Sequence, residues 1–173
     1  MIGVRILAFS FVPGLGFATA AATMVGQQLG ANDPKEAVRA GWRATGGAMI
    51  VLSSAGLAIV LCAEALAAAF GQAGTRTTEL AMTFIYILAV AQPLMAIEFA
   101  LAGALRGAGD TRFPLLAFSA GLFVFRLGGA LVAFSLYPGS VVAVWSCLLA
   151  DYVVKAALLA ARFQRGAWKR IEV

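Results

Sequence analysis

Residues 44–63 read "ATGGAMIVLSSAGLAIVLCA", a run of twenty residues with no charged side chain. A helix needs about 20 consecutive apolar residues to cross the hydrocarbon core of a bilayer. Residues 80–97 form a second uncharged window of nearly the same length. The whole chain of 173 residues is 62% hydrophobic and 12% charged, with a mean hydropathy of +0.91. Soluble domains seldom have this composition, so the sequence predicts an all-α integral membrane protein.

Five apolar segments, each long enough to span a membrane as a helix, follow one another along the chain. We place them at residues 7–30, 34–70, 77–106, 111–137 and 140–163. The turn "GANDPKE" (residues 30–36) separates the first two. In it Asp33 can cap the following helix, Pro34 suits the first helical position, and Glu36 has capping-box spacing. "YPGS" (residues 137–140) predicts a short turn before the last segment.

The stretch "GALRGAGDTRFP" (residues 103–114) places several charges and glycines between two apolar runs. Gly107 and Gly109 permit a sharp reversal of the chain. Asp110 or Thr111 can then cap the next helix. These residues predict a tight turn at a membrane face. Pro93 lies inside the preceding segment and predicts a kink there.

The basic residues predict the orientation of the segments. They flank the first turn, the 103–114 turn and the C-terminal end of the last segment, as follows: Lys35, Arg39, Arg43, Arg106, Arg112, Arg162, Arg165, Lys169 and Arg170. If five helices alternate in direction, these three places share one side, and the other side has only Arg5 and Arg76. By the positive-inside rule, the basic turns and the C-terminus are cytoplasmic and the N-terminus lies outside.

Four charged residues fall within apolar segments, where charge is costly and usually functional or paired. At 1.5 Å per residue, Arg126 and Asp151 lie about 21 and 16 Å from the basic side, so they can pair. Asp151 and Lys155 share a helix face at i, i+4 spacing. For Arg126, Asp151 and Lys155 we therefore favour structural ion pairs that fix helix register.

Glu98 is the fourth of these residues and has no evident partner close to it in the sequence. It follows the kink expected at Pro93, where loosened backbone can admit water or an ion. A proton- or cation-coupling role and a structural role are both open for Glu98. Gln27 and Gln28, near the end of the first segment, can line a polar path or form hydrogen bonds between helices.

Several other classes of function lack support in the sequence. There is no histidine, and Cys62 and Cys147 stand isolated in apolar runs, so we expect no metal site. No glycine-rich phosphate loop, nucleophile elbow or paired metal-ligand spacing appears, and we expect no enzyme. Basic residues flank the apolar segments instead of clustering with aromatic residues, so we expect no nucleic-acid partner.

Four stretches in order carry a resemblance to a known family. They are "FVPGLGFATAAATMVGQQLGANDPKEA" (residues 11–37), "GALRGAGDTRFP" (103–114), "FRLGGALVAF" (125–134) and "RFQRGAWK" (162–169). Together they resemble the multidrug and toxic compound extrusion (MATE) transporters. Their order and spacing are similar to those of the family's C-terminal lobe, from its eighth helix to its end.

The resemblance implies secondary antiport by a protein of two six-helix lobes. Such transporters exchange cationic or amphipathic compounds for sodium ions or protons, and need no cofactor beyond that coupling ion. Residues 103–114 resemble the family's cytoplasmic turn between the tenth and eleventh helices. The resemblance places Glu98 on the tenth helix, where some branches keep an acidic residue that couples to cations.

By this resemblance, residues 1–173 form part of one lobe, with about five of the family's twelve helices. We expect an N-terminal lobe, from the same gene or a separate chain, as a partner, together with a small cationic substrate and membrane lipid. We expect a bacterial inner membrane location, and no transport by residues 1–173 alone. Two alternatives are a flippase-like transporter of lipid-linked glycans from the same superfamily, and a truncated membrane protein that transports nothing.

Overall fold

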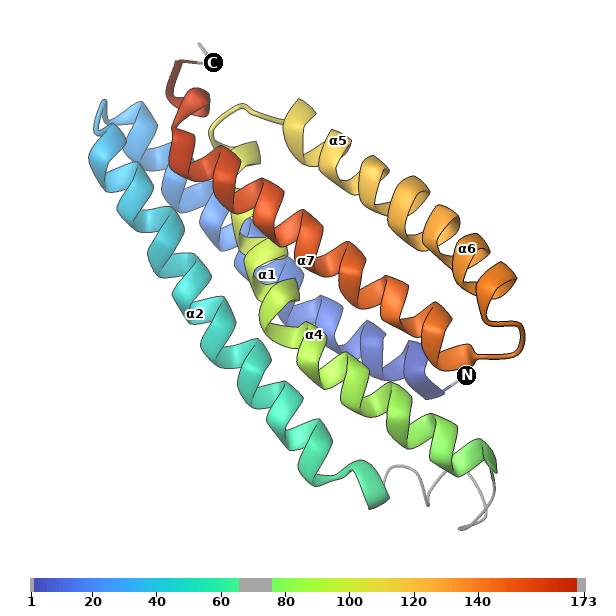
Figure 1. Cartoon of the computed structure of the whole chain (residues 1–173). Coiled ribbons are helices and arrows are strands. Elements are labelled where there is room, and N and C mark those ends of the chain that lie inside the picture. The colour runs from blue at the N-terminus through green and yellow to red at the C-terminus, as the bar shows by residue number, and fades with distance from the viewer. Residues whose placement is uncertain (1, 66–75, 171–173) are drawn as a thin grey trace.

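The computed structural model describes residues 2–65 and 76–170, with side chains described for residues 11–65 and 79–168. Long helices make up most of the described chain, and no strand occurs in these ranges (Figure 1). The elements are α1 (Ile2–Gly30), α2 (Pro34–Leu61), α4 (Arg76–Gly107), α5 (Arg112–Ala120), η1 (Gly121–Gly128), α6 (Gly129–Leu136), α7 (Val141–Arg165) and the short η2 (Ala167–Arg170). The expected all-α class is confirmed.

The helix ends agree with the expected segments to within a few residues, with two exceptions. First, α1 begins at Ile2 instead of residue 7. Second, α2 ends at Leu61 with Cys62 as its C-cap, so the expected segment 34–70 is interrupted at residue 62, and residues 63–65 are helical again. Residues 66–70 of that segment lie outside the described residues. α4 continues through Pro93 as one helix of 32 residues.

The turn before α2 shows why that helix begins where it does. Asp33 Oδ1 accepts hydrogen bonds from the backbone N–H groups of Lys35 (3.1 Å) and Glu36 (3.0 Å), and Pro34 occupies the first turn. These bonds satisfy donors that a helix start leaves unpaired. Glu36 does not complete a capping box, because its carboxylate forms ion pairs with Arg39 and Arg43.

The turn between α4 and α5 is built by the glycine and aspartate of the 103–114 stretch. Gly109 has a φ of 82°, which only glycine adopts without strain. Asp110 Oδ1 accepts a hydrogen bond from the Phe113 N–H at 3.3 Å, whereas the Thr111 side chain makes no capping bond. Of the two expected caps, Asp110 therefore supplies the side chain.

The segment 112–136 is a composite helix, which the sequence did not predict. A π-helical stretch of 8 residues, η1, separates α5 from α6. Apolar periodicity gives no warning of this change, because apolar residues predominate on both sides of it. π-Helical turns are rare and often occur at functional sites, and η1 carries Arg126.

α4 lies at the centre of the bundle, where it packs against α1, α2 and α7 (Figure 1). The composite helix α5–η1–α6 runs alongside α7 on the outer side. Glycines bring α1 and α4 into close contact: a Cβ added at Gly103 or Gly107 would overlap the backbone of Ala18 or Ala22. Small residues at such positions are typical of helix packing in membranes.

The outer surface of the bundle is apolar over most of its length. Large apolar side chains such as Ile50, Leu61 and Leu131 are 73%, 77% and 71% exposed. Within the described residues, four helical stretches are long and apolar enough to cross a membrane: Pro34–Leu61, Glu79–Gly107, Arg112–Leu136 and Val141–Arg165. Exposing so much apolar surface to water would be strongly unfavourable, so this is an integral membrane protein.

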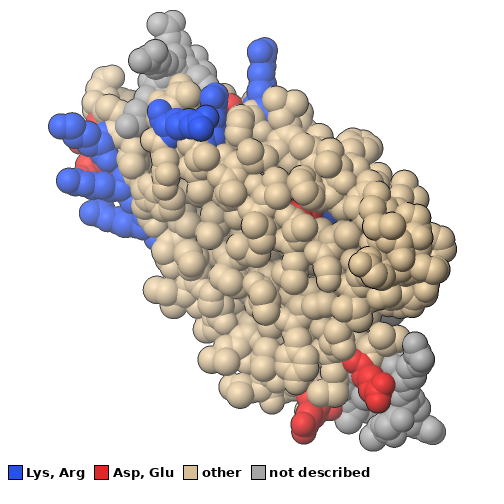
Figure 2. All heavy atoms as spheres, viewed as in Figure 1, with Lys and Arg blue, Asp and Glu red and all other residues tan. Residues whose placement is uncertain are grey.

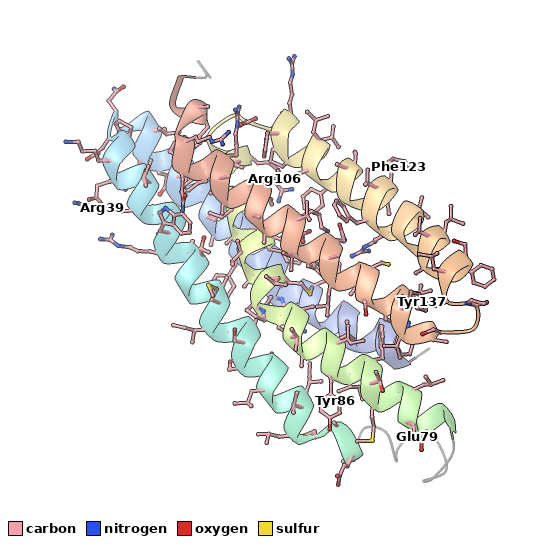
Figure 3. The ribbon with its side chains drawn as sticks, viewed as in Figure 1. Arg39, Glu79, Tyr86, Arg106, Phe123 and Tyr137 are labelled. Carbon is pink, nitrogen blue, oxygen red and sulfur yellow. The ribbon has the colours of Figure 1, made fainter. Side chains whose placement is uncertain are left out.

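Charged side chains gather at the two ends of the bundle. Figure 2 shows lysine and arginine at one end, together with a few acidic side chains, and only acidic side chains among the described residues at the other. In Figure 3, Arg39 and Arg106 lie toward the first end, which we call the basic end, and Glu79 lies at the other. The α1–α2 turn, the α4–α5 turn and the end of α7 meet at the basic end (Figure 1).

Candidate functional site

Four charged side chains from three elements meet inside the bundle. Lys155 Nζ lies 3.0 Å from Glu98 Oε1 and 3.0 Å from Asp151 Oδ2. Arg126 Nε donates to Asp151 Oδ2 at 2.7 Å. Glu98 comes from α4, Arg126 from η1, and Asp151 and Lys155 from α7. We call these four residues the central ion cluster.

The central ion cluster is buried and sums to zero charge. Glu98, Asp151 and Lys155 are at most 5% exposed, and the Arg126 side chain is 33% exposed. An isolated charge in such a place would lose several kcal/mol of hydration, whereas two cations and two carboxylates compensate one another. The cluster is therefore tolerated only as a set, because removing one member leaves another charge without compensation.

Two aromatic rings complete the surroundings of the Lys155 ammonium. Its Nζ lies 4.7 Å from the ring centre of Tyr152 and 5.2 Å from that of Phe118. The Arg126 guanidinium also lies 5.3 Å from the Tyr152 ring centre. Aromatic faces attract cations, most strongly where water is excluded. Two carboxylates and two rings therefore surround this ammonium.

Gly121, at the start of η1, allows the close approach of the helices around the cluster. A Cβ at this position would overlap Asp151 Oδ1 and lie 2.8 Å from Lys155 Cδ. The absence of a side chain thus lets η1 lie directly against the charged face of α7. Sequence reasoning missed both Gly121 and Tyr152, although a glycine facing a charged helix was a usable signal.

The structure places all four charged residues singled out in the sequence together. Arg126, Asp151 and Lys155 form the pairs considered from the sequence. Glu98, for which the sequence offered no partner nearby in the chain, pairs with Lys155. The two residues are 57 positions apart, so only the packing of α7 on α4 brings them into contact.

One oxygen of each carboxylate in the central ion cluster is buried without a hydrogen-bond partner among the described residues. These atoms are Glu98 Oε2 and Asp151 Oδ1. A buried acceptor of this kind carries a desolvation cost that a proton, a cation or a water molecule would relieve. The cluster therefore has two buried oxygens that can accept a hydrogen bond or serve as ligands.

Gln27 and Gln28, the expected polar-path residues, lie elsewhere. Both are in the last turn of α1, next to the basic end, and Gln27 is exposed. Their backbone carbonyls accept hydrogen bonds from Ala31 and Asp33 in the turn that follows. They are not part of the central ion cluster.

A second ion pair, which the sequence did not predict, lies at the basic end. Arg162 Nε of α7 donates to Asp110 Oδ2 at 2.8 Å, and its guanidinium lies 5.1 Å from the Phe113 ring centre. Asp110 is nearly buried, while the Arg162 side chain is 30% exposed. The same aspartate thus caps α5 and holds α7. We call Asp110 and Arg162 the basic-end pair.

Comparison with known proteins identifies the family. The sequence profile of the MatE family matches residues 1–132. The chain is 31% identical over 169 residues to "Probable multidrug resistance protein NorM" of Brucella suis, covering 95% of this chain. It is 33% identical over 170 residues to the protein of that name from Mesorhizobium japonicum, and 26% identical over 172 residues to the one from Thermotoga maritima. In each case the match covers 36% of the relative's length. The chain belongs to the MatE family.

Proposed function

We propose that this chain is part of a secondary antiporter that exports cationic or amphipathic compounds in exchange for sodium ions or protons. The observation that carries the proposal is the similarity of nearly the whole chain to proteins named for multidrug resistance. The coupling ion moves down its gradient while the exported compound moves against its own. No catalytic residue takes part.

Glu98 is the coupling residue in this proposal. It lies on α4, the helix that packs against α1, α2 and α7, and is 3% exposed. One of its oxygens pairs with Lys155, and the other has no hydrogen-bond partner among the described residues. A carboxylate held in this way can gain or lose a cation or a proton as its surroundings change.

A second lobe completes the transporter. The match covers 36% of the length of the relatives, and antiporters built from two halves bind substrate at the interface between them. Half of such an interface leaves the substrate site open to lipid. Residues 1–173 alone therefore do not transport.

The basic end faces the cytoplasm of a bacterium, and the protein lies in the inner membrane. The support is the charge difference between the two ends, read by the positive-inside rule (Figure 2). A cysteine at Arg112, which is exposed at this end, is labelled by a membrane-impermeant thiol reagent only from the cytoplasmic side. Gly107 is unsuitable for the label, because a side chain there would overlap Ala22. Cys62 and Cys147 are first replaced by serine, because Cys62 is a free, exposed thiol; labelling of intact cells at Arg112→Cys in that background contradicts this orientation.

Lipid-linked glycan flipping receives less support from the site. Binding an anionic lipid headgroup calls for an excess of positive charge, whereas the central ion cluster sums to zero. The cluster's unpaired atoms are carboxylate oxygens, which favour a cation over an anion. Cation-coupled export therefore fits the buried chemistry better.

Reconstitution in liposomes tests the proposal. Ethidium efflux is followed under an imposed sodium or proton gradient, with residues 1–173 alone and with these residues inside a full-length family member. We expect gradient-dependent efflux only from the full-length protein. Absence of gradient-dependent efflux from the full-length protein contradicts the proposed function, and sustained efflux from residues 1–173 contradicts the need for a second lobe.

A further inference from the structure

The central ion cluster contains a cation of its own at the point where a coupling ion would bind. The Lys155 ammonium lies 3.0 Å from an oxygen of Glu98 and 3.0 Å from an oxygen of Asp151. Aside from Lys155, the only positive charge in the cluster is the Arg126 guanidinium, whose ion pair is with Asp151. The ammonium therefore bridges the two carboxylates.

Charge balance limits what else can bind there. With Lys155 in place the cluster is neutral, and an added sodium ion would leave one buried positive charge without compensation. Such a charge costs several kcal/mol. Without the ammonium, Glu98, Asp151 and Arg126 sum to one negative charge, which matches one monovalent cation. Either the lysine or a free cation can occupy the position, but both together are unfavourable.

We infer that Lys155 is a tethered competitor for a monovalent cation that Glu98 and Asp151 bind, so that the cation enters only when the ammonium leaves. This inference rests on the proposed function for what the cation does, but the binding itself does not depend on transport. Displacing Lys155 would also break the Lys155–Glu98 pair, the only ion pair between α4 and α7 in the described parts of the chain. Cation entry would thus loosen α7 from the centre of the bundle.

The surroundings of the site fit this exchange. Glu98 Oε2 and Asp151 Oδ1 are buried oxygens without hydrogen-bond partners among the described residues, and they supply further ligands for a cation that prefers oxygen. No group of three carboxylate, cysteine or histidine side chains is placed to hold a metal ion in the described parts of the chain. Two carboxylates beside one guanidinium suit a singly charged ion and not a divalent one.

The test is sodium titration of the purified protein in lipid nanodiscs, read as a shift in melting temperature. Lys155→Met keeps the approximate volume and removes the charge. We expect sodium chloride, raised from 5 to about 500 mM at alkaline pH, to raise its melting temperature by about 4 °C or more relative to N-methylglucamine chloride. Alkaline pH limits competition by protons for the same carboxylates.

Three matched proteins define the outcome. The unaltered chain and Lys155→Arg keep a tethered positive charge, so neither responds to sodium beyond the N-methylglucamine control. The double variant Lys155→Met with Glu98→Gln has lost the cation's charge partner and does not respond either. A sodium response confined to Lys155→Met supports the inference.

Two outcomes overturn it. Lys155→Met could melt cooperatively with no sodium-specific shift, or the unaltered chain could show a shift as large as the variant's. If Lys155→Met does not insert into the membrane, the same sodium titration is carried out on Lys155→Gln, with the same expected shift. If neither variant inserts, the Lys155 charge is needed for folding and the inference is wrong. Because no gradient or second lobe is involved, these results are independent of the efflux assay for the proposed function.

Discussion

The central ion cluster and the basic-end pair both connect α7 to its neighbours, yet they do so under different physical conditions. The basic-end pair lies at the water-facing end of the bundle, where the Arg162 side chain is 30% exposed and Asp110 also caps a helix. The central ion cluster lies along the apolar length of the bundle, and three of its four members are almost fully buried.

The difference indicates different roles. A partly exposed pair contributes little free energy beyond its capping bonds, and water can replace it. A buried cluster contributes little net stability compared with apolar residues of similar volume, but losing one member is very costly. Stability alone does not explain a buried ion cluster, because apolar residues would stabilise the bundle at least as well. We therefore favour a functional role for the cluster and a structural role for the pair.

Removing Asp151 gives the largest expected loss of stability. Its carboxylate contacts both Arg126 and Lys155, so Asp151→Ala leaves two cations facing the single carboxylate of Glu98. We expect a loss of about 3–5 kcal/mol of unfolding free energy. Denaturant titration in mixed micelles measures this. A loss under about 1 kcal/mol would mean that water reaches the cluster and compensates its charges.

A methyl group at Gly121 tests the packing of the cluster without changing its charge. Gly121→Ala forces the new Cβ against Asp151 Oδ1, so η1 or α7 has to shift. We expect a cost of about 1–3 kcal/mol in the same titration. The control is Gly46→Ala, where an added Cβ meets nothing within 4 Å; it should be neutral or slightly stabilising. Equal effects of the two changes would contradict the close approach of η1 to α7.

The basic-end pair predicts a smaller effect. Asp110→Ala removes the bond to the Phe113 N–H and the partner of Arg162. We expect a loss of about 1–2 kcal/mol, the usual range for a helix cap. Thr111→Ala is the control, because its side chain makes no capping bond, and should change stability by less than about 0.5 kcal/mol. If the two substitutions cost the same, Asp110 is not the residue that holds this turn.

The smallest effect is expected at the surface pair of Glu36 and Arg39 in the first turns of α2. The Arg39 side chain is 66% exposed, and exposed pairs of this kind contribute about 0–1 kcal/mol. Arg39→Gln should therefore leave the denaturant midpoint almost unchanged. A loss as large as that of Asp110→Ala would contradict the claim that exposed ion pairs contribute less free energy in this protein than buried ones.

The sequence could predict the helices because the responsible signals are local. Uncharged runs set the lengths, and Asp33 with Pro34 marks a helix start whatever surrounds it. The π-helical stretch η1 could not be predicted, since it depends on how the segment packs on α7. The end of α2 at Leu61 could not be predicted either, because it lies inside an apolar run that contains no helix-breaking residue.

Part of the candidate site could be predicted from the sequence, because some of its contacts join residues on one helix or on neighbouring helices. Asp151 and Lys155 share one helix face, and Arg126 lies at a comparable depth on the preceding helix, so simple geometry indicated those pairs. The contact between Glu98 and Lys155 joins helices that are distant in the sequence. Whether α7 turns its charged face toward α4 is decided by the packing of the whole bundle, which no local pattern encodes.

Efflux by Glu98→Gln tests the central claim most directly. In a full-length family member carrying these residues, ethidium efflux under a sodium or proton gradient is compared between Glu98→Gln and Asp110→Asn, each normalised to folded protein. We expect at least about a tenfold loss of efflux for Glu98→Gln with normal membrane insertion, and near-normal efflux for Asp110→Asn. Gradient-driven efflux by Glu98→Gln at the unaltered rate would contradict it and reduce the central ion cluster to a structural element.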